Sequence, residues 1–167
     1  MKFFKILGFK FAIFVGFMRI PFVFKKTSLI KEKVVVSRVM TEKNINTVED
    51  VARYLSTLKY KRDKFNSQFF AHETIKNNGG DCEDIHRVGQ IMLEILDKSV
   101  YLVYALTKKF GHAFIVFEDD GQIKGMDYSR IIEGDDIEDV ITDVMSRYGD
   151  RNVLYYELRD MEFNKIS

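Results

Sequence analysis

The chain is poor in cysteine, proline and tryptophan: its 167 residues include one cysteine, one proline and no tryptophan. A single cysteine excludes an intramolecular disulfide and a four-cysteine zinc site. The apolar N-terminal stretch contains no run long enough to span a bilayer, because Lys5, Lys10 and Arg19 interrupt it and about 20 apolar residues are needed. With 46% hydrophobic and 31% charged residues, the composition indicates a globular protein and excludes a wholly disordered or collagen-like chain.

Charge is distributed unevenly along the chain. The net charge is only +1, which argues against a nucleic-acid binder. Residues 1–40 nevertheless hold nine bases and a single acid, Glu32, so a basic head precedes an acidic body. The first 26 residues are also rich in phenylalanine. We expect residues 1–26 to be a core or edge element whose lysines reach water, a segment that binds a membrane or a partner, or a signal peptide.

The remainder, residues 27–167, is expected to form one domain. β-Branched residues predict a strand over residues 33–40. Helical spacing of apolar residues predicts helices over residues 48–59 and 82–97, and an acidic helix is expected over 135–147. The strands expected in the second half cover residues 100–106, 112–118, 122–128 and 152–158. Because helices come first and a run of strands follows, the pattern predicts an α+β fold with an antiparallel sheet.

The only cysteine, Cys82, lies in the segment GGDCED, residues 79–84. Two glycines allow a sharp turn, and a helix is predicted to begin at once. A thiol at a helix N-terminus meets unpaired N–H groups and a positive helix end, both of which favour the thiolate. A thiolate is the form of cysteine that attacks carbonyl carbon, and the same N–H groups can stabilise an oxyanion. Cys82 is therefore a candidate nucleophile.

A base for that nucleophile is suggested by a predicted hairpin. His112 opens one strand and Asp127 lies on its partner, with Asp119-Asp120-Gly121 between them as the turn signal. A loop of Asp119-Asp120 places His112 directly opposite Asp127, and a loop of Asp120-Gly121 makes them diagonal neighbours on one face. A three-residue loop with a bulge would separate them. Two of the three registers thus bring an imidazole and a carboxylate together, the base and orienting group of a triad.

The segments GGDCED, GHAFIVF and MDYS resemble the transglutaminase-like superfamily, in particular its branch of bacterial transglutaminase-like cysteine proteinases with a papain-like core. The resemblance covers residues 77–128, about a third of the chain. It implies a catalytic cysteine at the start of a central helix packed on an antiparallel sheet that carries the histidine and the aspartate. In these terms Cys82 resembles the nucleophile, His112 the general base and acid, and Asp127 the orienting carboxylate.

The resemblance also raises the question of calcium, which some relatives bind through acids that correspond to Asp81 and Glu83. Two acids do not supply the six to eight oxygen ligands, roughly, that calcium takes. We therefore expect no metal and no cofactor, and we assign both acids to the N-terminus of the helix. His86 lies one turn after Cys82 and could compete as base; we interpret it as a supporting or surface residue, and His72 as a surface residue.

The most direct function for this set is acyl transfer through a thioester, in its simplest form hydrolysis of a peptide or amide bond in a protein or peptide substrate. Transfer to an amine is an alternative outcome of the same machinery. The rival hypothesis is a non-catalytic interaction or assembly protein on a protease-like scaffold, with residues 1–26 as the binding element. The lack of disulfides favours a cytoplasmic location over membrane association or export.

Overall fold

The computed structural model describes residues 26–62 and 70–166. The predictions made for residues 1–25 therefore fall outside the described residues. The helices are α2 (Lys26–Lys43), α3 (Val48–Leu55), α4 (Ala71–Lys76), α5 (Cys82–Ile95) and α6 (Ile137–Arg147). The strands are β1 (Lys59–Tyr60), β2 (Gly79–Gly80), β3 (Ser99–Leu106), β4 (Gly111–Asp119), β5 (Gln122–Asp127), β6 (Arg130–Gly134) and β7 (Tyr155–Arg159).

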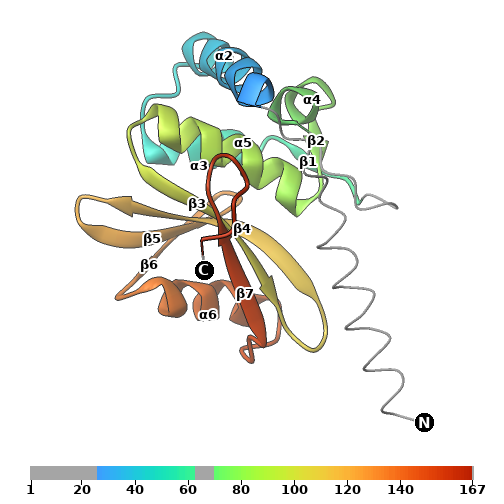
Figure 1. The fold of residues 1–167 in the computed structure, drawn as a ribbon, viewed down its shortest axis with the longest axis vertical. Coiled ribbons are helices and arrows are strands. Elements are labelled where there is room, and N and C mark those ends of the chain that lie inside the picture. Colours follow the sequence, from blue (N-terminus) through green and yellow to red (C-terminus); the bar gives the residue numbers. More distant parts are fainter. Residues whose placement is uncertain (1–25, 63–69, 167) are drawn as a thin grey trace.

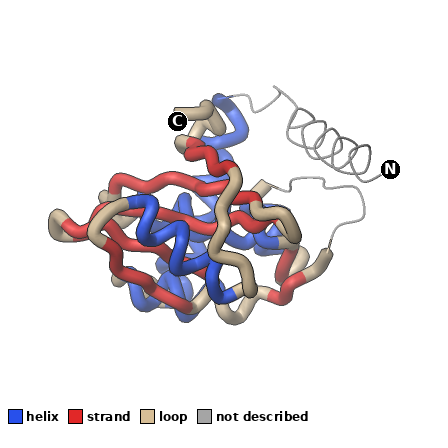
Figure 2. The backbone as a smooth tube through the Cα atoms, turned by 90° about the horizontal axis from the view of Figure 1, so that it is seen from below, coloured by secondary structure: helices blue, strands red, loops and turns tan. Residues whose placement is uncertain are grey.

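Five strands form one sheet in the order β6-β5-β4-β3-β7, and every neighbouring pair is antiparallel. One face of this sheet is covered by α5, with α2, α3 and α4 around it, and the other face by α6 (Figure 1). Figure 2 shows α6 crossing the strands on its own side. The mixed helix-and-sheet fold predicted from the sequence is thus confirmed. None of the helices in the described ranges combines the length and the apolar character that crossing a membrane requires.

Alternation along the central strands supplies both faces of the sheet with a core. On β3, Leu102 and Tyr104 pack in the cluster beneath α5, whereas Val103 and Ala105 pack in the cluster beneath α6. This is the period of two expected for a strand buried on both sides. Because both faces are covered, the ends of the strands are where polar side chains meet solvent.

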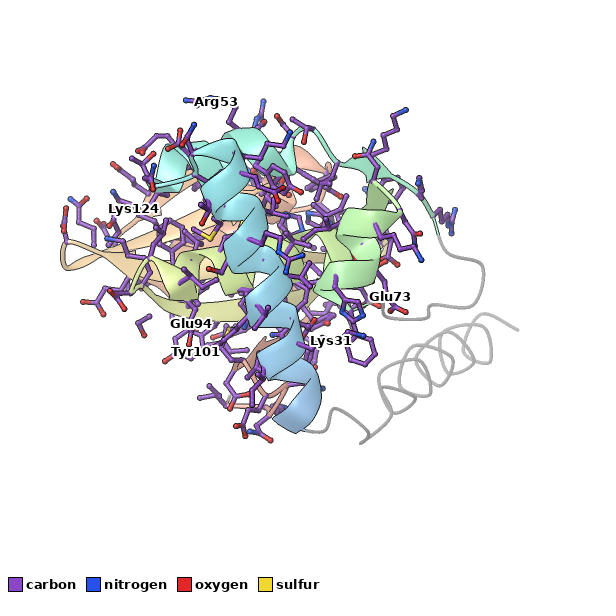
Figure 3. The ribbon with its side chains drawn as sticks, turned by 90° about the horizontal axis from the view of Figure 1, so that it is seen from above. Lys31, Arg53, Glu73, Glu94, Tyr101 and Lys124 are labelled. Carbon is purple, nitrogen blue, oxygen red and sulfur yellow. The ribbon has the colours of Figure 1, made fainter. Side chains whose placement is uncertain are left out.

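The strand predicted over residues 33–40 is wrong, because this segment belongs to helix α2. Its run of valines suggested a strand, but the buried side chains are those of Glu32, Val36 and Met40, which recur every four residues as on a helix face. Figure 3 shows α2 running across the outer side of the helical layer. Because Glu32 is charged, the helical period of this buried face is not visible when only the apolar residues are considered.

Other boundaries shift by a few residues. The helices predicted to begin at Val48 and Cys82 begin there, and each ends earlier than expected, at Leu55 and Ile95. Strand β6 was not predicted. Its five residues include two charged side chains and only two apolar side chains, so the segment has no run of strand-forming residues. The short parallel pair of β1 with β2 was not predicted either.

The hairpin between β4 and β5 selects one of the registers left open by the sequence. Asp119 pairs with Gln122, so the loop is Asp120-Gly121, with positive φ angles of 53° and 76°. Two positive φ angles in a two-residue loop are characteristic of the type I′ turn, whose twist matches that of the strands. In this register Asp127 is the diagonal neighbour of His112 on the same face of the sheet.

Candidate active site

The turn before α5 is built from glycines and a capping aspartate. Gly79 has a φ of 137°, and a side chain there would meet the Lys59 carbonyl oxygen of β1 at 1.9 Å. Asp81 caps the helix by accepting hydrogen bonds from the N–H groups of Glu83 (3.1 Å) and Asp84 (3.3 Å). In return the Asp84 carboxylate accepts from the Asp81 N–H at 3.1 Å. This reciprocal capping box fixes Cys82 as the first residue of α5.

The Asp81 carboxylate has a structural role at the start of α5. Asp81 uses one oxygen for two backbone N–H groups of the first turn, which is the N-terminal role expected for it. Because the Asp81 side chain accepts hydrogen bonds from the N–H groups of Glu83 and Asp84, this cap does not use the N–H group of Cys82.

The Cys82 thiol is held against strand β4. The backbone of Ala113 on β4 and that of Glu83 hydrogen-bond to the sulfur. Burial raises the pKa of the thiol to about 12; the Ala113 bond opposes this rise, and the charges of Asp81 and Glu83 add to it. The expectation that the helix start favours the thiolate is therefore wrong. The N–H groups at the helix start are present, but loss of hydration outweighs them.

His112 and Asp127 lie in direct contact, which the chosen register allows. The His112 Nε2 is 2.9 Å from the Asp127 Oδ1, and both side chains are buried. Burial alone would raise the pKa of Asp127, but the hydrogen bond and charge of His112, with smaller contributions from His86 and Tyr148, lower it below its usual value. Asp127 is thus an ionised carboxylate that fixes the imidazole by one of its nitrogens.

The thiol and the imidazole come from neighbouring positions in space. The sulfur is bonded by the backbone of Ala113, the residue that follows His112 on β4. Because Asp127 holds Nε2, the ring nitrogen of His112 that remains for a proton from the thiol is Nδ1. The structure therefore brings the three residues selected from the sequence to one end of the sheet, at the first turn of α5. Their catalytic roles stay predictions.

His86 is a member of this cluster whose place the sequence did not define. Its Nδ1 donates to the Cys82 carbonyl oxygen at 2.7 Å, because its Nε2 accepts the Tyr128 N–H at 2.9 Å and so carries no proton. The side chain is fully buried, and burial lowers its pKa to about 4, with a further contribution from the charge of His112. His86 is therefore neutral, and because both of its ring nitrogens are engaged in these hydrogen bonds, neither is open to the thiol proton. It ties the turn after Asp127 to the start of α5.

The expectation of a supporting role for His86 agrees with these bonds, whereas a surface position is wrong. The other histidine interpreted as a surface residue, His72, is half-buried and stacks on Phe70 at 5.5 Å between ring centroids.

Tyr148 is a second residue that the sequence analysis missed. It stands directly after α6, and its hydroxyl donates to the Asp127 Oδ2 at 2.9 Å. Its ring centroid lies 4.4 Å from that of His112, and its side chain is 43% exposed. Asp127 thus accepts one hydrogen bond on each oxygen, and a tyrosine covers the imidazole on the solvent side. Only its place at the end of a predicted helix could have drawn attention to it.

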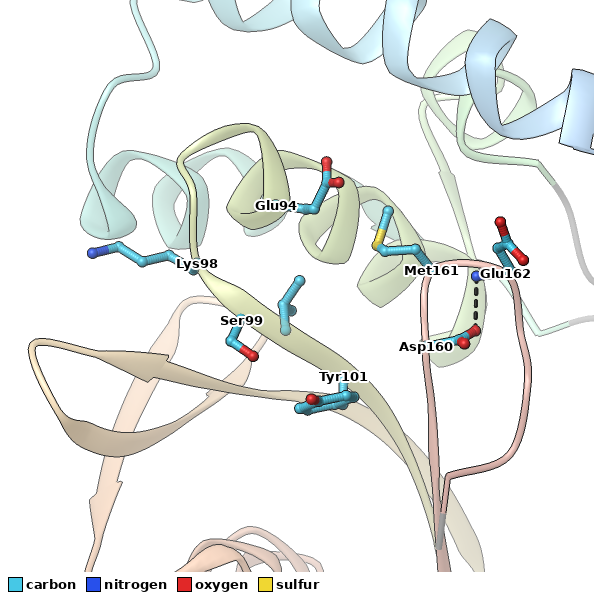
Figure 4. Close-up of a pocket in the computed structure, with 8 residues that line it drawn as sticks. Glu94, Lys98, Ser99, Tyr101, Asp160, Met161 and Glu162 are labelled. Carbon is cyan, nitrogen blue, oxygen red and sulfur yellow. Dashed lines mark hydrogen bonds between the residues drawn. The ribbon is translucent and has the colours of Figure 1, made fainter.

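A pocket of about 260 Å³ lies elsewhere in the molecule. It is formed by the end of α5, the start of β3 and the loop after β7, and Figure 4 shows Glu94, Tyr101 and Asp160 among its walls. Glu94 is near the C-terminus of α5, so about 18 Å of helix separates it from Cys82 at 1.5 Å per residue. This pocket therefore does not belong to the cluster around Cys82.

Comparison with known proteins finds structural similarity. No protein-family profile and no curated protein sequence matches the chain. A solved structure of a putative cysteine protease from Cytophaga hutchinsonii superposes with a TM-score of 0.49 and 16% sequence identity. The match covers 77% of this chain and 50% of that chain, so this chain spans half of that protein's length.

Proposed function

We propose that this protein catalyses acyl transfer through a thioester on Cys82, most simply hydrolysis of a peptide or amide bond. The observation that carries the proposal is the contact of His112 with Asp127 at 2.9 Å. His112 lies on β4, and the backbone of the next residue on that strand, Ala113, hydrogen-bonds to the Cys82 sulfur. Nucleophile, base and orienting carboxylate in this order form the general triad arrangement. The papain-like and transglutaminase-like character inferred from the sequence motifs is part of this proposal.

Acylation begins with a proton transfer. The Cys82 Sγ–H gives its proton to the Nδ1 of His112 while the sulfur attacks the substrate carbonyl carbon, so that a C–S bond forms and the carbonyl π pair moves to oxygen. The Cys82 N–H stabilises the resulting oxyanion. Collapse of this intermediate breaks the C–N bond, and the leaving amine takes the proton from His112. The product is an acyl thioester on Cys82.

Deacylation reverses the roles of the same groups. Water loses a proton to His112 as its oxygen attacks the thioester carbonyl, and the thiolate of Cys82 leaves and recovers that proton. Asp127 stays ionised throughout and stabilises the imidazolium that forms twice in the cycle. If an amine reaches the thioester in place of water, the same steps yield a new amide.

The raised pKa of the thiol favours proton transfer during the attack over a thiolate formed in advance. With its pKa raised to about 12 by burial, the thiol is protonated at neutral pH, and an acceptor must take its proton as the C–S bond forms. His112, fixed by Asp127, supplies that acceptor. We therefore expect the reaction rate to depend strongly on His112.

The test uses p-nitrophenyl acetate as a small activated acyl donor. We expect a burst of p-nitrophenolate equal to the enzyme concentration, an acetyl group on Cys82 by intact mass, and then slow turnover. Cys82→Ala should abolish the burst and the adduct, and His112→Ala should slow both. His72→Ala is the matched control, because it changes a half-buried histidine away from the cluster. Addition of glycinamide distinguishes the two outcomes, since N-acetylglycinamide forms only if an amine reaches the thioester.

Absence of an acetyl adduct in the folded wild-type chain would overturn the proposal. In that case the interaction role for residues 1–26 becomes the hypothesis to pursue. It predicts that a chain lacking this segment loses a partner that the Cys82→Ala variant keeps.

A further inference from the structure

The end of the sheet that carries Cys82, His112 and Asp127 is surrounded by exposed basic side chains. Four segments meet there: residues 59–62 around β1, residues 107–110 between β3 and β4, residues 128–130 between β5 and β6, and residues 148–152 after α6. Their exposed bases are Lys59, Lys61, Arg62, Lys108, Lys109, Arg130 and Arg151. We call these seven residues the basic rim. Asp150 is the only acid in the four segments, and it is half-buried.

The basic rim is not neutralised within the described part of the chain. Ion pairs form elsewhere, as between Lys98 and Asp119 or between Arg159 and Glu157. Across residues 26–62 and 70–166, no rim residue has a carboxylate oxygen within 4.0 Å. Lys61 and Lys109 each donate to a backbone carbonyl, which leaves their charge uncompensated.

The opposite end of the sheet has the reverse charge. It is formed by residues 94–99, 118–123, 133–136 and 160–162, which include a single base, Lys98. The acids of these four segments are Glu94, Asp97, Glu118, Asp119, Asp120, Glu133, Asp135, Asp136, Asp160 and Glu162. The small net charge of the whole chain thus conceals two ends of opposite sign, of which the positive one bears the candidate active site.

Two members of the rim stand beside the reacting groups. Arg130 is the cross-strand partner of Asp127, so the two side chains emerge on the same face of the sheet. The charge of Arg130 also acts on Tyr148, whose hydroxyl bonds Asp127. On the other side, Arg62 acts on Tyr60, and the exposed Tyr60 is in turn influenced by Cys82. Members of the rim therefore lie on two sides of the site, on β6 beside Asp127 and after β1 near Tyr60.

We propose that the substrate of this site is an acidic peptide segment, whose carboxylates are bound by the basic rim on either side of the cleaved or transferred amide. This inference rests on the proposed acyl-transfer function and names its substrate class. Exposed guanidinium and ammonium groups without internal partners bind carboxylates with little cost of breaking existing pairs. The carboxylates of the site itself, on Asp81, Glu83 and Asp127, are buried and do not face an incoming chain.

A peptide is favoured over an extended polyanion by the placement of the rim. The bases encircle one end of the sheet around a thiol and an imidazole, and the acidic opposite end repels a polyanion that extends along the molecule. A nucleic acid has no acyl bond that the Cys82 site would open in the proposed reaction.

The first test compares two alkylating reagents that differ in charge. Because Cys82 is the only thiol, rates with iodoacetate and iodoacetamide both report on this one site. We expect their ratio to be higher in the folded chain than in the chain unfolded in urea. In Lys108→Gln/Lys109→Gln/Arg130→Gln the folded-state ratio should fall by about threefold or more, because three positive charges near the thiol are lost. About 0.5 M salt should lower the wild-type ratio towards that of the variant.

The matched control removes the same charge from another surface. Lys31→Gln/Arg38→Gln/Lys43→Gln changes three exposed bases on α2, and the reagent ratio should stay at the wild-type value. An equal ratio in wild type and rim variant would overturn the acidic-substrate inference and leave the thioester mechanism standing. Failure of both reagents to modify the folded chain would instead count against the proposed function itself, because no substrate could reach the sulfur.

The second test measures binding directly. A fluorescein-labelled oligoglutamate should bind the Cys82→Ala protein in fluorescence anisotropy, and an oligolysine of equal length should not. The rim variant should lose this binding and the α2 control should retain it. Binding to single-stranded DNA or to phosphatidylserine vesicles without binding to oligoglutamate would overturn the inference and assign the basic rim to that polyanion.

Discussion

Helix α5 carries two buried polar clusters that differ in what their groups can do. At its start, the first cluster joins Cys82 and His86 to His112 and Asp127 across the sheet. The second cluster is centred on Arg87, the residue that follows His86. Arg87 pairs with Glu32 of α2 at 3.0 Å, and this pair is as deeply buried as the groups of the first cluster. Burial and hydrogen bonding alone therefore do not distinguish a candidate active site.

The two clusters differ in whether their groups can exchange protons and in whether they lie near solvent. Arg87 stays charged at every relevant pH, and it also bonds Gln90 at 2.7 Å and the Met161 carbonyl at 2.9 Å, so it joins three parts of the chain. The first cluster contains a thiol and the imidazole of His112, between which a proton can move, and the exposed Tyr148 lies on its solvent side. The structural cluster fixes charges, whereas the candidate site can move a proton.

The largest expected effect separates rate from stability. His112→Ala should lower the rate of Cys82 acetylation by p-nitrophenyl acetate by about 10²–10⁴-fold, because the acceptor of the thiol proton is lost. In urea unfolding, His112→Ala should lower the free energy of unfolding much less than Glu32→Gln does. A variant that unfolds at ambient temperature, or one that keeps the wild-type rate, would remove the distinction between the clusters.

The second effect concerns stability alone. Glu32→Gln leaves the charge of Arg87 buried without its partner and should lower the free energy of unfolding by about 3–5 kcal/mol. Lys33→Gln is the control on the next residue, because its pair with Glu94 is partly exposed and should be worth at most about 1 kcal/mol. Denaturant unfolding measures the free energy of unfolding of both variants. Similar decreases in the two variants would show that the buried pair stabilises the fold no more than the partly exposed one.

The third effect is a dependence of stability on pH that arises from His86. Its pKa is lowered from 6.5 to about 4 in the folded protein, so the unfolded chain binds the proton first as the pH falls. The stability that this neutral histidine contributes is therefore complete above pH 6.5 and decreases towards pH 4, by roughly 3 kcal/mol in total. Unfolding midpoints between pH 7 and pH 4 measure this slope.

His86→Gln should flatten that slope, and His72→Gln should leave it unchanged. If the His86 variant retains the full slope, another group causes the loss of stability in acid. Asp127, with a pKa below its usual value, would lose stability in the same direction but only at still lower pH.

The smallest expected effect tests the support of the imidazole. Tyr148→Phe removes the hydroxyl that bonds the Asp127 Oδ2 while it keeps the ring against His112. We expect the acetylation rate to fall by about tenfold, because the carboxylate that orients His112 loses one of its two hydrogen bonds. An acetylation rate equal to that of the wild type would show that the hydroxyl does not support the imidazole.

The sequence predicted the parts of the site that depend on local patterns. The glycines and Asp81 indicated the turn and the helix start, and turn chemistry restricted the hairpin to registers of which one brings His112 beside Asp127. The fold class followed from the order of helical and strand patterns.

What the sequence could not give depends on packing between distant segments. The pKa of Cys82 is decided by how far the packing of α5 on the sheet buries the thiol, which no local pattern shows. The bonds of His86 to Tyr128 and of Tyr148 to Asp127 cross 42 and 21 residues of chain. The error at residues 33–40 has the same origin, because Glu32 could be recognised as buried only once its partner Arg87 was known.

The position of Cys82 at the seam between α5 and β4 also makes it a reporter of assembly. The sulfur is covered only when the helix has docked on the strand that bonds it, and no second thiol competes for a label. A brief pulse of a thiol reagent during refolding would mark the molecules in which the two layers have not yet joined. The residue proposed for chemistry would then also report when the two layers join.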